Sequence, residues 1–573
     1  MLEADTRVYE MKILVIVPRM QLEETENYIY MFPLGLAYIS AVLKKAGHLV
    51  ACLNLNHCSG GVSEIINNFI KKSGPFDFAC TGGISTIYRQ IKLIVEVLHA
   101  FHPDIKLILG GGLISSEPEL MFNALKPDYI VLEEGEETIC ELLSCIEKKG
   151  DIGRIAGIGY RGQADEIVIN KVRLPIAEID SIPWPDFEGF EFEKYLDHML
   201  PSDQFGYELY DRPRVYPIIC SRSCPFSCTF CYHPIGKKYR QRSVNSIIEE
   251  LAVMVKRYRI NIIGIYDELF SNDREWLREF CDQMKAFLKE LPWECKWGCQ
   301  IRVDKLDNEM LKMMKDAGCY ALSYGFESYS PVVLKSMRKH ITPQQINQAV
   351  ELTLKNNLSL QANFIFGDPA ETTQTAKETL DYWKANVEAG VMLTFINPYP
   401  GTPLYQKCLA KGIIKDKLDF IENRIFGIQN MSDTMTNREF IYIWRDINKA
   451  VIKDRVYAGK IVIDKATDGT FVVSVECPHC KKTIRYGNYL LKSTHYFSVM
   501  MYCRACRRRF FVASGLFRLV FNGLLLIYFL VPTISYKFYE HIWPRRYLLR
   551  NAFNRSRNLL KQTVGLNRVV KNA

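Results

Sequence analysis

Short apolar runs alternate with amphipathic stretches from residue 11 to about residue 150. Runs such as "KILVIVP", "FDFACTGG" and "KLILGGG" have the length of strands, and stretches such as "YRQIKLIVEVLHAFHP" have the period of a helix. Strands of about five residues separated by helices of about 10 to 15 residues are typical of a parallel, doubly wound sheet. The pattern therefore predicts an α/β domain at 11–150.

The carboxyl ends of these predicted strands carry small or turn-forming residues. Doubly wound sheets bind their ligands at this edge. The candidates for ligand contact follow three different strands: Ser85, Gly110, Gly111, Gly135 and Glu136. Ordinary βα turns have the same composition, so each glycine cluster alone leaves both interpretations open.

A second alternating region begins after an irregular stretch. Residues 151–212, which include "DSIPWPDFEGF", are typical of a linker. Residues 213–420 then repeat the strand and helix alternation. The helices are expected near 244–257, 273–290, 307–317, 343–356 and 372–388. About six βα units fit a full or partial parallel (β/α)6 barrel of the TIM type, whose chemistry takes place at the C-terminal strand ends.

Beyond residue 420 the pattern changes. We expect a helical extension at 421–470, a small β-rich module at 471–510, and an apolar segment with a basic tail at 511–573. The apolar run at 519–536 has no charge and is just long enough to span a membrane. Both of its flanks are basic, which opposes a single span. We therefore predict that it lies on or dips into an anionic membrane surface, the alternative being a buried helical hairpin on the barrel.

Charge and cysteine content narrow the class of protein. The net charge is +9, but the stretch from Lys537 to the end holds nine Lys or Arg residues against one acid, Glu540. The body is thus close to neutral, and we expect no nucleic acid partner. The first residues place acids before a short apolar run, so we expect no signal peptide and a cytoplasmic protein, attached at most to the cytoplasmic membrane face. In that reducing compartment the 18 cysteines are poor disulfide candidates.

Three cysteines directly follow the first predicted barrel strand. Cys224, Cys228 and Cys231 have the spacing C-x3-C-x2-C. Three thiolates on one short loop can hold three irons of a 4Fe-4S cluster and leave the fourth iron open for a ligand. Zinc, with Cys220 or His233 as the fourth ligand, is the alternative that the spacing leaves open.

The sequence around these cysteines resembles the radical S-adenosylmethionine (radical SAM) enzymes, in particular their cobalamin-binding branch. "SCPFSCTFC" is similar to that family's cluster loop, and "YDELF", "YGFES", "FGDPAET" and "PYPGTPLY" follow it in the order that the family shows. In the first domain, "PLGLAYISAVLKKAGH", "LGGG" and "EGEET" resemble the same branch. The resemblance covers residues 11 to about 420 and implies a Rossmann-like cobalamin-binding domain followed by a radical SAM barrel.

The resemblance also implies roles for individual residues. S-adenosylmethionine would chelate the open iron and be cleaved on reduction to a 5′-deoxyadenosyl radical. Asp267 or Glu268 would meet its amino group, Glu327 with Ser328 its ribose, and Gly367 would let the backbone approach the nucleoside. A helix cap for Asp267 and an ion pair between Glu327 and Arg302 are the structural alternatives. Cys220 lies outside the triad and is expected to be structural.

Cobalamin is expected without the usual histidine ligand. Many cobalamin domains supply a histidine from D-x-H-x-x-G after the first strand, and that sequence is missing here. His57 and Gly60 have H-x-x-G spacing but follow the second strand, which we interpret as coincidence. The lower face of cobalt would then be unligated or meet another residue.

A second cysteine set lies near the C-terminus. Cys477, Cys480, Cys503 and Cys506 have the spacing C-x2-C-x22-C-x2-C. Four thiolates in this pattern predict tetrahedral zinc in a ribbon-like module, with an auxiliary iron-sulfur cluster as the alternative.

The leading functional hypothesis is methylation of an unactivated carbon by a radical SAM enzyme that uses cobalamin. Oxidative ring closure, as in anaerobic porphyrin cyclases, is the alternative within the branch. A non-catalytic, metal-binding scaffold at a membrane is the alternative from another class. The expected partners are a small-molecule or lipid substrate and an electron donor such as flavodoxin or ferredoxin.

Overall fold

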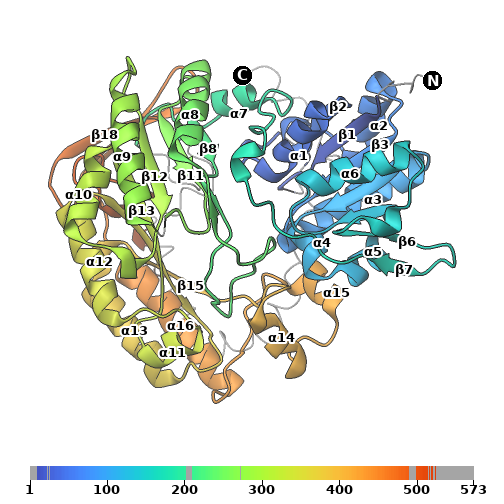
Figure 1. Ribbon diagram of the computed structural model, residues 1–573. Coiled ribbons are helices and arrows are strands. Elements are labelled where there is room, and N and C mark those ends of the chain that lie inside the picture. The colour runs from blue at the N-terminus through green and yellow to red at the C-terminus, as the bar shows by residue number, and fades with distance from the viewer. Residues whose placement is uncertain are drawn as a thin grey trace, which may run out of the picture.

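The computed structural model describes residues 10–21, 24, 26–201, 209–271, 273–489, 499–513, 515, 518–519 and 523. Two α/β domains lie side by side, the first blue and the second green to yellow in Figure 1. Nearly all of the predicted apolar segment and basic tail, to which the predicted membrane contact belongs, falls outside the described residues. Within that part, no helix is both long enough and apolar enough to cross a bilayer.

The first domain is built on a seven-stranded sheet with the order β2-β1-β3-β4-β5-β6-β7. Its parallel strands are β1 (Lys12–Val17), β2 (Leu49–Asn54), β3 (Phe78–Gly82), β4 (Lys106–Gly110) and β5 (Tyr129–Val131). The main helices are α1 (Leu34–Lys45), α2 (Val62–Ser73), α3 (Tyr88–Phe101), α4 (Gly112–Ser116), α5 (Pro118–Leu125) and α6 (Glu136–Glu147). Successive side chains of β1 enter two different hydrophobic clusters, as expected for a sheet covered on both faces. The predicted doubly wound fold is confirmed.

The predicted linker at 151–212 is partly a component of this sheet. Strands β6 (Ile158–Arg161) and β7 (Ile167–Ile169) extend it as antiparallel strands beyond β5. Helix α7 (Phe192–Asp197) follows and leads towards the second domain. The predicted boundary at residue 150 therefore cuts through the first sheet, because two short strands with Gly-containing turns read as irregular sequence.

The second domain is an open barrel of six parallel strands. They lie in chain order: β8 (Val215–Ile218), β11 (Ile262–Ile265), β12 (Lys296–Gln300), β13 (Cys319–Glu327), β14 (Ser359–Phe366) and β15 (Met392–Phe395). The helices between them are α8 (Val244–Tyr258), α9 (Arg274–Lys289), α10 (Asn308–Asp316), α11 (Pro331–Ser336), α12 (Pro343–Lys355) and α13 (Thr373–Ala385). Strands β8 and β15 form the two edges. The partial (β/α)6 prediction is confirmed.

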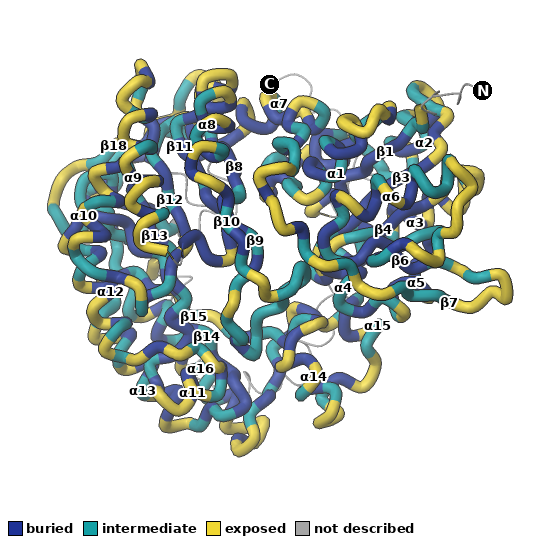
Figure 2. The backbone as a smooth tube through the Cα atoms, in the orientation of Figure 1, coloured by how far each residue is buried: buried dark blue, intermediate teal, exposed yellow. Residues whose placement is uncertain are grey.

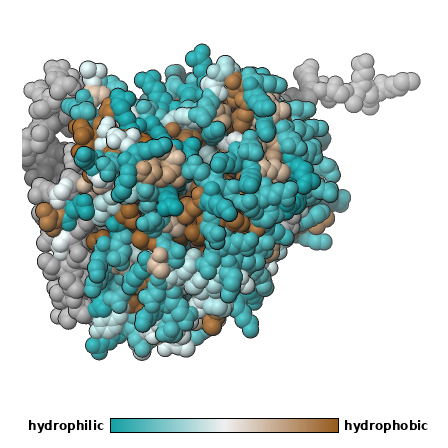
Figure 3. Space-filling model, turned by 90° about the vertical axis from the view of Figure 1, so that its left-hand side faces the viewer, coloured by the Kyte–Doolittle hydropathy of each residue, from teal (hydrophilic) through white to brown (hydrophobic). Residues whose placement is uncertain are grey.

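Side-chain caps explain why the barrel helices begin where they do. Ser243, Asp273, Asp307, Thr342 and Thr372 each accept a hydrogen bond from a first-turn N–H. The helices then bury one face against the strands and expose the other, as the alternating colours of Figure 2 show. The side of the molecule that carries α10 is mostly hydrophilic, with small, separate hydrophobic groups (Figure 3).

The chain beyond the barrel contacts both domains. Helix α14 (Pro403–Ala410) and the turn at α15 (Lys417–Asp419) return to the first domain, where Lys417 Nζ lies 2.8 Å from a carboxylate oxygen of Glu117. Helix α16 (Asn437–Lys453) packs against α13. The β-rich module comprises β16 (Ile461–Lys465), β17 (Phe471–Glu476), β18 (Thr483–Tyr489), β19 (Val499–Tyr502) and β20 (Arg509–Val512). It thus begins about ten residues before the predicted 471.

Candidate active site

The three cysteines of the first set lie on one loop at the carboxyl end of the barrel. The loop connects the short strands β9 (Ser221–Arg222) and β10 (Arg240–Gln241), which lie between the two domains in Figure 2. Cys228 is buried, and Cys224 and Cys231 are partly exposed. Cys220 is fully buried and its backbone N–H donates to Asp267, as expected for a structural thiol. The loop therefore carries three of the four thiols, and Cys220 lies before β9, outside the loop.

Cations surround these thiols. The Arg302 guanidinium lies 3.7 Å from the ring centre of Phe226 within the loop, and Lys339 Nζ lies 5.9 Å from that of Phe230. A hydrogen bond between the two thiols lowers the pKa of Cys228 and raises that of Cys231, so the first of the pair takes the thiolate form more readily. The charges of Lys339 and Arg302 favour the Cys228 thiolate, the form that binds metals.

The sulfurs of the loop bear on the zinc alternative, because Cys228 and Cys231 are within hydrogen-bond distance but no compact group of three or more ligand atoms forms there among the described residues. One zinc ion with Zn–S bonds of about 2.3 Å needs its thiolates about 3.8 Å apart. Among the described residues, only the second cysteine set gathers its ligand atoms within 4.8 Å of one another. A cluster that gives each thiolate its own iron does not require such a compact group. His233, the other proposed zinc ligand, directs Nδ1 towards Glu268 at 3.3 Å.

Asp267 supports the cluster loop. Its Oδ1 accepts the Cys220 N–H at 2.8 Å, and its Oδ2 lies 2.9 Å from Ser221 Oγ. It caps no helix. Burial raises the pKa of Asp267 to about 7 in spite of these hydrogen bonds. Glu268, next in the chain, has a side chain that is 36% exposed, so it is the carboxylate of this pair that remains open to a ligand.

We expect Asp267→Asn to be tolerated and Asp267→Ala to be harmful. The single proton of Ser221 has two acceptors, Asp267 Oδ2 and, at 2.7 Å, the carbonyl of Leu269. If Asp267 is protonated, its carboxyl donates to Ser221 Oγ and the Ser221 proton is free for the Leu269 carbonyl. The side-chain amide of asparagine can donate to Ser221 Oγ in the same place. Alanine instead leaves the buried Cys220 N–H unpaired, at a cost of about 1 to 3 kcal/mol. Thermal unfolding and iron content measure both variants, and equal losses would contradict the expected difference.

Glu327 and Ser328 lie at the end of β13 but point to different neighbours. Glu327 has φ +62° and binds Lys339 Nζ at 2.7 Å, so its ion pair is with Lys339 and not with Arg302. Ser328 Oγ lies 3.1 Å from Thr379 Oγ1 of α13 and is 1% exposed. The structure therefore brings Glu327 to the cluster loop, through Lys339, and places Ser328 against a barrel helix.

Gly367 directly follows strand β14 and has φ +106°, a conformation that favours glycine. A Cβ there would lie 3.2 Å from Ile396 and 3.7 Å from Phe440. Its N–H donates to the buried carboxylate of Glu371, and burial raises the pKa of Glu371 to about 8. The backbone turn and its packing explain this glycine without a ligand.

In the first domain, two predicted turns meet at the carboxyl ends of β3 and β4. Gly111 has φ +84°, and a Cβ on it would lie 2.9 Å from the backbone of Gly83. Ser85 is buried in the turn that follows Gly83. Ile84 between them is 60% exposed, and Met20, after β1, is 42% exposed. Strands β1 and β3 are neighbours in the order β2-β1-β3, so these apolar side chains flank the switch point at which such sheets bind ligands.

Gly135 and Glu136, the third predicted turn, lie at the boundary between the domains. Glu136 binds Arg222 Nη2 at 2.5 Å, and Glu134 binds Arg222 at 2.8 Å and Arg240 at 2.7 Å. Arg222 and Arg240 belong to β9 and β10, which flank the cluster loop. We call these four residues the interdomain ion pairs. Sequence reasoning missed Glu134 and both arginines, and the only signal was the position of Glu134 beside Gly135.

His57 is engaged within the protein. Its Nε2 lies 2.7 Å from Tyr30 Oη and its Nδ1 lies 2.9 Å from Glu191. The side chain has no exposed surface. The two ring nitrogens therefore connect Tyr30 of the first domain to Glu191 of the predicted linker. This agrees with the interpretation of the H-x-x-G spacing as coincidence.

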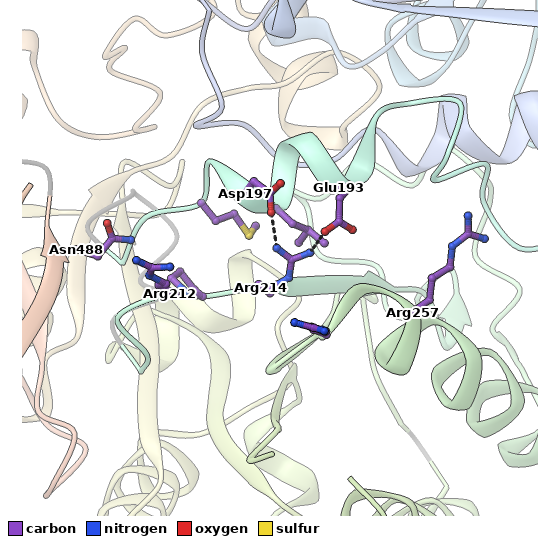
Figure 4. Close-up of a pocket in the computed structure, with 10 residues that line it drawn as sticks. Glu193, Asp197, Arg212, Arg214, Arg257 and Asn488 are labelled. Atoms are coloured by element: carbon purple, nitrogen blue, oxygen red, sulfur yellow. Dashed lines mark hydrogen bonds and ion pairs between the residues drawn. The ribbon is translucent and has the colours of Figure 1, made fainter. Parts of the chain in front are cut away.

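A cavity of about 620 Å³ lies far from the cluster loop, at the amino end of β8. Figure 4 shows Arg214 between Glu193 and Asp197 of α7, which it contacts at 2.6 and 2.7 Å. These two carboxylates neutralise the central arginine. The cavity is at the opposite end of the barrel from the cysteines, and we assign it no part in their chemistry.

Comparison with known proteins agrees with this arrangement. Residues 218–382 match the model of the radical SAM superfamily, and residues 28–143 match the B12 binding domain. The chain is a radical SAM enzyme. Because a B12 binding domain precedes the barrel, it belongs to the cobalamin-binding branch of that superfamily, and the resemblance of the motifs is confirmed.

Two relatives and one solved structure show which activities are named for similar proteins. An uncharacterized methyltransferase of Pyrococcus horikoshii is 28% identical over 419 residues, 70% of this chain and 84% of the relative. The anaerobic magnesium-protoporphyrin IX monomethyl ester cyclase of Rubrivivax gelatinosus is 27% identical over 388 residues, 65% of this chain and 66% of the relative. The solved structure of the radical S-adenosylmethionine methyltransferase TsrM from Kitasatospora setae, with cobalamin and a 4Fe-4S cluster bound, has a TM-score of 0.57 at 17% identity and covers 70% of this chain and 75% of that one. These matches favour an enzyme over the non-catalytic scaffold.

Proposed function

We propose that this enzyme methylates an unactivated carbon of a small molecule, using S-adenosylmethionine, a 4Fe-4S cluster and cobalamin. The observation that carries the proposal is the contact between the two domains at their ligand-binding edges. A Cβ on Gly112, the first residue of α4, would lie 3.4 Å from the ring of Tyr232 and 3.8 Å from Pro234. Both of these residues lie within three positions after Cys231 on the cluster loop.

The residues present fit both cofactors. The positive charges of Arg302 and Lys339 lie against the rings of Phe226 and Phe230 within the cysteine loop and suit a thiolate-ligated iron-sulfur cluster. Of the three thiols, only Cys228 has a lowered pKa, since burial raises that of Cys224 and the hydrogen bond with Cys228 raises that of Cys231. The edge of the first domain combines close glycine turns with exposed apolar side chains, which suits a large, partly apolar ring system. When bound, the cluster supplies the electron that cleaves S-adenosylmethionine, and cobalamin carries the methyl group.

The chain's own residues have three tasks in this proposal. Glu268 meets the amino group of S-adenosylmethionine, since Asp267 is occupied by the loop. Glu327, held by Lys339, contacts its ribose, with Ser328 and Gly367 shaping the strand ends. In the first domain, Ser85, Gly110 and Gly111 line the cobalamin edge, and Gly135 with Glu136 fix it to the barrel.

Labelled methyl transfer tests the proposal. The reconstituted, reduced full-length enzyme, supplied with hydroxocobalamin and a cell extract, should release 5′-deoxyadenosine from S-adenosylmethionine with a trideuterated methyl group. A product that carries the deuterated methyl group supports methylation. The similarity to the porphyrin cyclase makes oxidative ring closure the second candidate, and an unlabelled product that has lost hydrogen would support it. Absence of 5′-deoxyadenosine would contradict both.

Cobalamin retention should depend on the exposed apolar edge. We expect Ile84→Asp to retain at least about tenfold less cobalamin than the wild type, since burying a carboxylate in place of an apolar side chain costs more than about 1.4 kcal/mol. The absorbance of bound cobalamin after gel filtration measures this. Val253→Asp is the control, because Val253 is also an exposed apolar residue, at 50%, but lies on α8. Equal retention in both variants would place cobalamin elsewhere.

A further inference from the structure

The second cysteine set lies outside both matched domains and forms a compact group of four sulfurs. Cys477 and Cys480 follow β17, and Cys503 and Cys506 lie between β19 and β20. The Sγ atoms of Cys477 and Cys506 are 3.7 Å apart, and those of Cys480 and Cys503 are 3.8 Å apart. A zinc ion with four Zn–S bonds of about 2.3 Å places its sulfurs about 3.8 Å apart. The spacing therefore matches one tetrahedral zinc ion.

The backbones of the two cysteine turns have the same hydrogen bonds. In the first turn, the Cys477 N–H donates to Lys482 O at 2.9 Å and the Lys481 N–H to Cys477 O at 3.0 Å. In the second, the Cys503 N–H donates to Arg508 O and the Arg507 N–H to Cys503 O, both at 2.9 Å.

Strain at matching positions gives a second, independent sign of a built site. Lys481 has φ +60° and Arg507 has φ +63°, a conformation that non-glycine residues rarely adopt. Such strain persists where the surroundings fix the backbone, and it recurs here in both cysteine turns. In addition, the Cys506 N–H donates to Cys503 Sγ at 3.4 Å within the second turn.

His479, between the first two cysteines, has a buried side chain and is not a ligand. Its side chain is 3% exposed, and Nε2 lies 2.9 Å from the carbonyl of Arg509. Four thiolates and one Zn²⁺ carry a net charge of −2, which the neighbouring basic residues oppose: Lys481, Lys482, Arg504, Arg507 and Arg508. A set of four thiolates leaves zinc no open position for a substrate, so the site is structural.

The module contacts the amino end of the barrel, opposite the cluster loop. Arg504 Nη2 lies 2.7 Å from a carboxylate oxygen of Asp211. The Gly487 N–H, also in the module, donates to Asp211 at 2.8 Å. Arg508 Nη1 lies 3.2 Å from Glu388. Asp211 precedes β8 and Glu388 precedes β15, and these are the two edge strands of the open barrel. One small module thus touches the amino ends of both edges.

We propose that Cys477, Cys480, Cys503 and Cys506 bind a structural zinc ion, and that the module it holds together clamps the two edge strands of the open barrel. The zinc ion fixes the two cysteine turns, and through them Arg504 and Arg508. Because no strand in the described part of the chain joins β8 to β15, contacts of this kind hold the two edges at a constant separation. The inference does not depend on the reaction that the barrel catalyses.

Metal analysis of the full-length protein tests the zinc site. The wild type, purified without reconstitution, should contain one zinc per chain, and Cys224→Ser should contain the same amount. The double variant Cys480→Ser with Cys506→Ser, which alters the two partly exposed ligands, should contain about tenfold less zinc. Zinc retained by the double variant, or iron in place of zinc at this set in Cys224→Ser, would overturn the zinc assignment.

Hydrogen exchange tests the clamp in the same proteins. In the double variant, amides at 209–214 and 386–391 should exchange at least about tenfold faster, while those of α2 in the first domain should be unchanged. If the double variant does not fold, removal of zinc from the wild type with a chelator gives the same comparison. Faster exchange confined to 459–513 would show that the module does not clamp the barrel.

Discussion

Cys228→Ser is expected to abolish reductive cleavage of S-adenosylmethionine. Cys228 is the buried member of the cluster loop, and its thiol is the one whose pKa the surroundings lower to about 6. A serine hydroxyl stays protonated in the same place and is a poor iron ligand. The loss should exceed the roughly 100-fold that is typical when a residue supporting a metal ligand is removed. Iron content and 5′-deoxyadenosine release under reducing, anaerobic conditions measure it.

Cys220→Ala is the matched control for this prediction. Cys220 is the fourth thiol of the same segment, but it is fully buried behind the loop and only its backbone N–H takes part in the support of Asp267. The variant should therefore keep its iron and its 5′-deoxyadenosine release. Loss of both in Cys220→Ala, together with their retention in Cys228→Ser, would show that the cluster ligands are wrongly assigned.

The fold of each domain could be predicted from local patterns. Strand length and helical period predicted the barrel helices closely: the expected 244–257 is α8 at Val244–Tyr258, and the expected 343–356 is α12 at Pro343–Lys355. These signals are local, because an amphipathic face lies within one element. The short strands β6 and β7 carry only three or four residues each, too few for a periodic pattern, and they were missed.

The residues of the candidate site were also predictable only in part. The three cysteines of the loop are recognisable because all of them come from one short stretch of sequence, and their spacing alone indicates a metal-binding loop. Asp267 and Glu327 are different, since their partners, Cys220 and Lys339, come from other segments. The interdomain ion pairs depend on how the two domains lie relative to each other. The sequence motifs of the separate domains contain no information about this.

Glu134→Gln is expected to have the second largest effect. It should lower the free energy of unfolding and the yield of methylated product per 5′-deoxyadenosine. The Glu134 side chain is 4% exposed and accepts hydrogen bonds from Arg222, Arg240 and, at 2.7 Å, the Ile176 N–H. An amide leaves the buried Arg240 guanidinium without a carboxylate partner. Breaking a buried ion pair from one side costs about 3 to 5 kcal/mol. Chemical denaturation measures this loss, with Glu133→Gln as the control, since the neighbouring Glu133 takes no part in the interdomain ion pairs.

The same variant should separate S-adenosylmethionine cleavage from product formation. Arg240 also donates to Ser223 Oγ at 3.2 Å, beside Cys224, so the interdomain ion pairs fix the cluster loop relative to the cobalamin edge. In Glu134→Gln the three cysteines remain, and 5′-deoxyadenosine should still form, but the yield of methylated product per 5′-deoxyadenosine should fall by about tenfold or more. An unchanged ratio would mean that Glu134 serves stability alone.

The pH dependence of the stability difference shows whether the charge of Glu134 is responsible. Burial by itself raises the pKa of this carboxyl, but the hydrogen bonds from Arg240 and Arg222 and the charge of Arg222 outweigh it, so the pKa in the folded protein lies below its ordinary value. A carboxyl of this kind binds fewer protons when folded, and its stabilising contribution is complete above its unfolded pKa and lost as the pH falls through the folded one. The free energy of unfolding of the wild type should therefore exceed that of Glu134→Gln by a constant amount near neutral pH. The difference should shrink only at acidic pH, where the protonated carboxyl and the amide are alike, whereas a difference independent of pH would assign the effect to packing.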